Sequence, residues 1–212
     1  MSAAGPERTA PHRTLIVTCA ALLRDVRAVL GQLGPDPGTA FDVVPLASAL
    51  HNRPERIPAA VAQALDERAG TYDHAVVLYG DCGTGGLLDA LLAERGVERL
   101  PGPHCYSFFA GAPVFDALAE AEPGTFYLTD YLARHVDQLV FAGLGLDRHP
   151  ELRDAYFGHY ARVVLLSQTD DPALVEAGRG AARRLGLAFE HRHVGREPFA
   201  RSLRHLLAPV RS

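Results

Sequence analysis

The chain has 212 residues, of which 48% are hydrophobic and 22% charged, and its formal net charge is −4. This composition excludes a wholly disordered chain, and the acidic balance argues against a general nucleic-acid-binding protein, which carries a basic excess. All 21 basic residues are Arg. Without Lys the chain has neither the amine of a Schiff-base enzyme nor the Gly-Lys-Ser/Thr end of a P-loop, so both classes are excluded.

The first 13 residues are small, polar and contain Pro, so we expect a disordered leader over 1–13. The apolar run 14–23 has the length of a signal sequence core, but Arg24 follows it and no small-residue cleavage site does. The run is far shorter than the ~20 residues that cross a bilayer. The three cysteines are an odd number, which does not suit a secreted disulfide framework. We therefore expect a cytoplasmic protein with reduced thiols and no membrane partner.

The first half alternates apolar, β-branched runs with helical spacing. Strands are predicted at 14–18, 41–46 and 74–79, and helices at 20–33, 54–69 and 87–95. The Pro- and Gly-containing stretch 100–108 is predicted to be a short strand or a loop.

The second half repeats the alternation. Strands are predicted at 124–128, 162–166 and 187–193, and helices at 112–121, 130–141, 151–160, 172–186 and 198–207. Strands that alternate with helices predict an α/β fold with a mostly parallel sheet covered on both faces, a Rossmann-like three-layer arrangement. We expect a single domain over 14–212, made as one unit or as two closely packed, loosely similar halves.

All three cysteines fall in or near connections that follow strands. Cys19 comes directly after the first strand, His51 after the second, Cys82 three residues after the third, and Cys105 near a further strand. Because the carboxyl ends of parallel strands share one edge, we expect these side chains to lie there together. Thiolates and an imidazole suit zinc or an iron–sulfur centre, although the chain has no Cys-x-x-Cys pair. The alternative is three unconnected thiols in the core.

The loop 80–86 after the third strand is rich in glycine. Its Gly80, Gly83, Gly85 and Gly86 and the following helix N-terminus predict a small-anion or cofactor phosphate site, because backbone N–H groups there face one point. The spacing is not that of a dinucleotide fingerprint. The same geometry would lower the pKa of Cys82 and make it nucleophilic. The alternative is a tight turn that packs against its neighbours.

Several short segments resemble, in order, those of one bacterial and archaeal family, the proteins with domain of unknown function 1638. They are Thr18-Cys19 and the segments 50–54 (LHNRP), 78–83 (LYGDCG), 103–105 (PHC) and 124–129 (GTFYLT). The resemblance runs from about Thr14 to Leu207. It departs from the family pattern at His104 and Cys105, which are adjacent here and separated by an Asp in that pattern.

The resemblance implies that Cys19, His51, Cys82 and Cys105 belong to one site, which favours a zinc or iron–sulfur protein. Family members resemble accessory proteins of corrinoid-dependent methyl transfer, which implies a corrinoid or methyltransferase partner besides a small-molecule ligand. Two other functions stay open. One is a metal-free thiol enzyme that uses Cys19 and Cys82 as acid and base, as two-cysteine racemases do. The other is a small-anion-binding module at loop 80–86.

Overall fold

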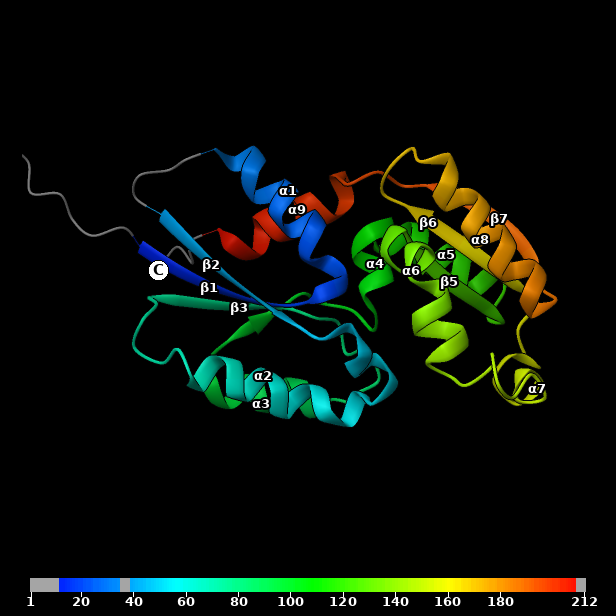
Figure 1. Ribbon diagram of the computed structural model, residues 1–212. Coiled ribbons are helices and arrows are strands. Elements are labelled where there is room, and N and C mark those ends of the chain that lie inside the picture. Colours follow the sequence, from blue (N-terminus) through cyan, green and yellow to red (C-terminus); the bar gives the residue numbers. More distant parts are fainter. Residues whose placement is uncertain (1–11, 35–38, 209–212) are drawn as a thin grey trace, which may run out of the picture.

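The computed structural model describes residues 12–34 and 39–208, and its strands form two separate parallel sheets (Figure 1). The first sheet has the order β2-β1-β3-β4 and the second the order β5-β6-β7. The strands of the first sheet are β1 (His12–Cys19), β2 (Thr39–Leu46), β3 (His74–Leu78) and β4 (Glu98–Arg99). Those of the second are β5 (Thr125–Thr129), β6 (Arg162–Ser167) and β7 (Ala188–His193). The predicted α/β fold is confirmed, and the two expected halves correspond to the two sheets.

Helices cover both faces of the first sheet, with α1 and α9 on one side and α2 and α3 on the other (Figure 1). These helices are α1 (Leu23–Leu33), α2 (Ile57–Asp66), α3 (Leu87–Arg95) and α9 (Glu197–Leu207). The central strands β1 and β3 are apolar on both faces, and Ile16, Val17, Val76 and Val77 are completely buried. A strand covered by helices on both sides needs such a continuous apolar run.

The second sheet shows the same layering through alternating side chains. Tyr127, Val164 and Leu166 face one cluster with α4 and α5, whereas Val163 and Leu165 face another with α6 and α8. Because successive side chains of a strand point to opposite faces, both faces of this sheet need a cover. The helices of this half are α4 (Cys105–Ala110), α5 (Ala112–Ala121), α6 (Asp130–Arg134), α7 (Leu152–Phe157) and α8 (Pro172–Leu185).

The last helix returns from the second half to the first. The chain leaves β7 and places α9 against the first sheet, where Phe199 is buried and its ring stacks on Phe109 of α4 at 5.4 Å. At the start of α9, Arg196 Nε donates to Asp25 Oδ1 of α1 at 2.7 Å. Residues from both ends of the chain therefore complete the first half.

Some boundaries differ from those predicted. The stretch 100–108 is a loop followed by α4, because the helix begins at Cys105 as soon as the Pro-containing segment ends. The predicted helix 130–141 is broken into α6 and a π-helical turn, Asp137–Ala142. The leader prediction lies mostly outside the described residues, although His12 and Arg13 already belong to β1. In the described parts of the chain, no helix has the length and apolar character needed to cross a membrane.

Candidate functional site

The four residues predicted as metal ligands stand at the carboxyl edge of the first sheet in the order of its strands. His51 lies in the 3-10 turn Ser48–Asn52 after β2, Cys19 ends β1, Cys82 follows β3, and Cys105 begins α4 beyond β4. All three cysteines are free thiols, with Cys19 and Cys82 buried and Cys105 partly exposed. Parallel topology thus brings residues distant in sequence to one edge.

The turn that carries Cys82 is held against the segment that leads to Cys105. The backbone N–H of Cys82 donates to Pro103 O at 2.8 Å, and that of Asp81 donates to Gly102 O at 3.0 Å. Gly80 permits this approach, since a Cβ there would lie 3.0 Å from backbone atoms of His104. Cys82 itself has φ +50°, the only positive φ outside glycine among the described residues. Such a left-handed cysteine is uncommon and costs backbone strain, which the surrounding contacts must hold.

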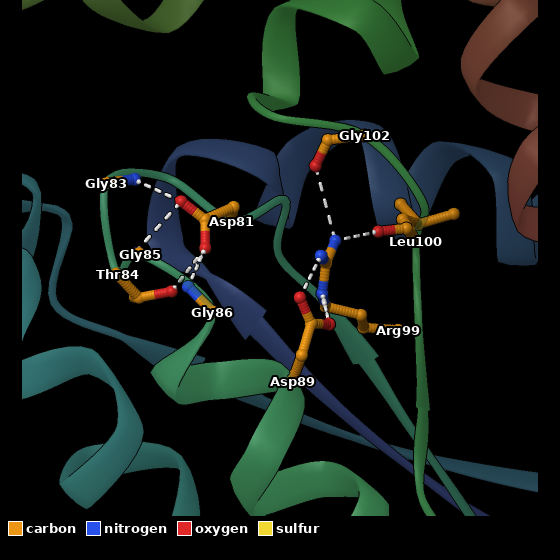
Figure 2. Close-up of polar contacts among 9 residues, drawn as sticks. All are labelled: Asp81, Gly83, Thr84, Gly85, Gly86, Asp89, Arg99, Leu100 and Gly102. Atoms are coloured by element: carbon orange, nitrogen blue, oxygen red, sulfur yellow. Dashed lines mark hydrogen bonds and ion pairs between the residues drawn. The ribbon is translucent and has the colours of Figure 1, made fainter.

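Arg99 fixes the same segment from the other side (Figure 2). Its guanidinium donates from Nε and Nη2 to the carboxylate of Asp89 on α3, at 2.6 and 2.8 Å. Its Nη1 donates to Leu100 O at 2.7 Å and Gly102 O at 3.3 Å. One largely buried side chain therefore ties α3 to the loop that positions Cys105.

Cys19 and His51 are in direct contact. Cys19 Sγ accepts from Ala21 N at 3.4 Å and lies 3.7 Å from His51 Nδ1. That nitrogen is also 3.2 Å from Ser48 O. Burial opposes protonation of His51, but hydrogen bonds to Cys19 and Cys82 outweigh it and raise the pKa of the imidazole to about 10.

Cys82 and Cys105 form a second contact. A hydrogen bond from Cys105, opposed by burial and aided by His51, lowers the pKa of the Cys82 thiol to about 4. The same hydrogen bond, together with burial, raises the pKa of Cys105 well above its ordinary value. At neutral pH, Cys82 is thus a thiolate that lies between an imidazolium and a protonated thiol.

Tyr79 belongs to this cluster although sequence reasoning assigned it only to a strand. Its ring stacks on His51 with centroids 6.2 Å apart, and it is 1% exposed. Its hydroxyl makes no hydrogen bond to the described residues. Burial and the neighbouring Cys19 raise the pKa of Tyr79 well above its ordinary value. The available signal was an aromatic residue at the carboxyl end of a buried strand, directly before the glycine loop.

The glycine loop already contains an anion of its own (Figure 2). Asp81 accepts hydrogen bonds from the N–H groups of Gly83, Gly85 and Gly86 at 3.2, 3.2 and 2.8 Å, and from Thr84 Oγ1 at 2.7 Å. These bonds, led by that from Gly86, lower the pKa of Asp81 to about 2. A second anion would have to displace this carboxylate. The anion-binding role of Gly80, Gly83, Gly85 and Gly86 stays a prediction.

Two findings concern the predicted metal site. Among the residues that the structure describes, no group of three or more His, Cys, Asp or Glu side chains is arranged to hold a metal ion. His104 contributes its backbone, which packs on Gly80, while its ring lies 6.3 Å from that of Tyr106. The thiols and His51 are thus gathered at one edge without closed coordination geometry.

A cavity of about 150 Å³ opens beside the thiols, between the two halves. His51 and Cys105 line it, together with side chains of both halves. Those of the first half are Ala21, Ser48, Asn52, Tyr106 and Phe109, and those of the second half are Phe126, Thr129, Tyr131, Leu132, Leu139, Val140 and Leu144. A hydrogen bond of 3.0 Å between Ser48 Oγ and Tyr131 Oη joins the halves at this place.

A family model described as "Protein of unknown function (DUF1638)" matches residues 46–203, which is most of the chain. The chain belongs to the DUF1638 family. The match includes His51, Cys82 and Cys105 and begins after Cys19. Comparison with curated proteins and with solved structures gave no match. The DUF1638 resemblance predicted from the short motifs is therefore confirmed.

Proposed function

We propose that this DUF1638 protein binds a thiophilic metal centre, zinc or an iron–sulfur cluster, through Cys19, His51, Cys82 and Cys105. The observation that carries the proposal is the convergence of every cysteine of the chain, with one histidine, at the ends of neighbouring strands. A core that merely tolerated three thiols would have no reason to place all of them at one edge beside an imidazole.

The separation of two of these groups fits a shared ion. Tetrahedral zinc with Zn–S near ~2.3 Å and Zn–N near ~2.05 Å holds its sulfur and nitrogen ligands about 3.6 Å apart. Cys19 Sγ and His51 Nδ1 are 3.7 Å apart. Since metal ligands must be deprotonated, the thiolate of Cys82 is already prepared for an ion.

Binding requires two local changes. His51 Nδ1 must give up its contact with Ser48 O, because a coordinating nitrogen has no proton to donate. Cys105 must lose its proton, as a positive ion beside the sulfur favours. Both changes need only side-chain rotation and proton release, so binding is expected to release protons and to depend on pH.

The family resemblance suggests what such a centre would do. A zinc ion bound by thiolates acts as a Lewis acid or activates a thiol for alkylation. We therefore propose an accessory role in one-carbon metabolism beside a corrinoid or a methyltransferase partner, in the reducing cytoplasm where free thiols persist. This step rests on analogy within the family.

A second candidate function is a metal-free thiol enzyme. Its specific support is the contact between Cys82, whose pKa is about 4, and Cys105, whose pKa is raised well above normal. One sulfur then accepts a proton while its neighbour can donate one, which is the division of labour of a two-cysteine racemase. The sequence paired Cys19 with Cys82 for these roles, whereas the contacts favour Cys82 with Cys105.

Metal analysis of anaerobically purified protein separates the two candidates. We expect a stoichiometric metal in the wild type and less metal in each of C19S, C82S, C105S and H51Q. His74→Gln is the matched control, because His74 begins β3 at the opposite end of the sheet; its metal content should equal that of the wild type. A wild-type protein with no stoichiometric metal after this preparation would favour the thiol enzyme.

A further inference from the structure

The cavity between the halves is the feature from which the identity of a ligand can be inferred. We infer that it binds a small uncharged organic molecule, with an apolar body and one hydrogen-bond-accepting group, placed against Cys105 and His51. The inference rests on the proposed function in that the thiol site supplies the chemistry to which this ligand is presented.

The size of the cavity limits the ligand to a few heavy atoms. Its volume is about 150 Å³, similar to that of an engineered apolar protein cavity of ~150 Å³ that binds benzene or xenon. Nucleotides and other cofactors of ordinary size need the larger pockets of ~300–1,000 Å³.

The walls select an apolar body without charge. Phe109, Phe126, Leu139 and Val140 supply most of the surface, and none of the described lining residues is Arg, Asp or Glu. A carboxylate or phosphate placed here would lose its hydration without gaining an ionic partner that binds it in two directions. Carboxylate substrates are therefore disfavoured.

The polar wall supplies a hydrogen-bond donor. Ser48 Oγ and Tyr131 Oη share one hydrogen bond, so whichever hydroxyl donates, the other keeps its proton. Neither hydroxyl has a further partner among the described residues. A ligand that offers an oxygen acceptor at this point completes the pair, and its apolar body then lies along the aromatic wall.

The test uses three probes of similar size: phenol, toluene and benzoate, titrated calorimetrically into the purified full-length protein. We expect phenol and toluene to bind, phenol about fivefold more tightly, the ratio that one net hydrogen bond gives. Benzoate should bind at least tenfold more weakly than phenol. Equal affinity for benzoate and phenol, or binding of neither phenol nor toluene, would overturn the inference.

Two variants place the binding in the cavity. Leu139→Trp fills it and should abolish binding of both probes, while Leu33→Trp, on the exposed end of α1, should leave both unchanged. The double variant S48A/Y131F should keep toluene binding and remove the advantage of phenol. Unchanged affinities in L139W would contradict the inference. Metal content is measured on the same samples, so a protein that binds phenol without metal refutes the proposed function and leaves the cavity assignment standing.

Discussion

Among individual residues, Cys82 has the least ordinary environment. It combines a left-handed backbone with a sulfur that accepts a hydrogen bond from Cys105 and lies beside the imidazole of His51. The sequence indicated its place after a strand and a lowered pKa near the glycine loop. It could not indicate Cys105 as the partner, because that contact depends on a loop whose path runs through Pro101, Gly102 and Pro103.

The low pKa of Cys82 predicts an unusual alkylation profile. After removal of metal by a chelator, the rate of iodoacetamide modification at Cys82 should stay level from about pH 8 down to about pH 5, because the pKa of this thiol is about 4. An ordinary thiol with a pKa near ~8.5 loses about tenfold in rate per pH unit over this range. The rate is followed by mass spectrometry of the Cys82 peptide.

His51 provides the internal control for that experiment. His51→Gln removes the imidazolium, so the apparent pKa of Cys82 should rise while Cys105 still donates its hydrogen bond. His74→Gln should leave the profile unchanged, because His74 lies at the other end of the sheet. A wild-type profile that falls below pH 8 would show that Cys82 is an ordinary thiol.

At the scale of elements, close packing of loops brings the thiols together. The turn after β3 and the segment before α4 meet at Gly80, and Arg99 secures that segment to α3. Sequence patterns predicted the strands and helices well because their apolar periodicity is local. They missed the start of α4 at Cys105, since the Pro-Gly-Pro segment before it resembles a loop or short strand.

Gly80→Ala tests the close approach of the two loops. The added Cβ would lie 3.0 Å from three backbone atoms of His104, which cannot rotate away, so we expect a loss of about 1–3 kcal/mol in the free energy of unfolding. Gly31→Ala is the control: its Cβ meets nothing within 4 Å on an exposed helix, and it should stabilise by up to about 1 kcal/mol. Urea unfolding measures both, and equal effects of the two substitutions would refute the close approach.

Arg99→Met tests the clamp on the Cys105 segment. It removes charge-assisted hydrogen bonds to Asp89 and leaves the carbonyl of Leu100 without its donor, so we expect a loss of about 1.5–3 kcal/mol and a lower metal content. Arg95→Met on the same helix removes a looser pair with the exposed Asp66 and should cost at most about 1 kcal/mol. If Arg99→Met kept full metal content, Arg99 would have no part in positioning Cys105.

For the molecule as a whole, two parallel sheets share one chain and enclose the cavity between them. The alternation of strands and helices predicted both halves, because buried parallel strands carry a distinct apolar run. It could not predict how the halves meet, since the contact of Ser48 with Tyr131 and the return of α9 to the first sheet depend on side chains far apart in sequence.

The charge pair at the site should shape the pH dependence of folding of the metal-free protein. The pKa of Cys82 falls from 9.0 to about 4 on folding, so its contribution to stability is absent below pH 4 and complete above pH 9. The pKa of His51 rises from 6.5 to about 10, so its contribution is complete below pH 6.5 and lost as the pH passes 10.

Together these contributions predict that the stability difference between the wild type and C82S/H51Q increases from pH 4 to 6.5, stays level to about pH 9, and then declines. Urea midpoints over this range measure the difference. A difference that does not change between pH 4 and 6.5 would contradict the ionised pair.

X-ray absorption at the edge of the bound metal tests the central claim most directly, because it reports the atoms next to the ion. For a zinc site, the account predicts three sulfur neighbours at about 2.3 Å and one nitrogen at about 2.0–2.1 Å, with one sulfur fewer in C82S. A first shell made only of oxygen and nitrogen, or one unchanged in C82S, would contradict it.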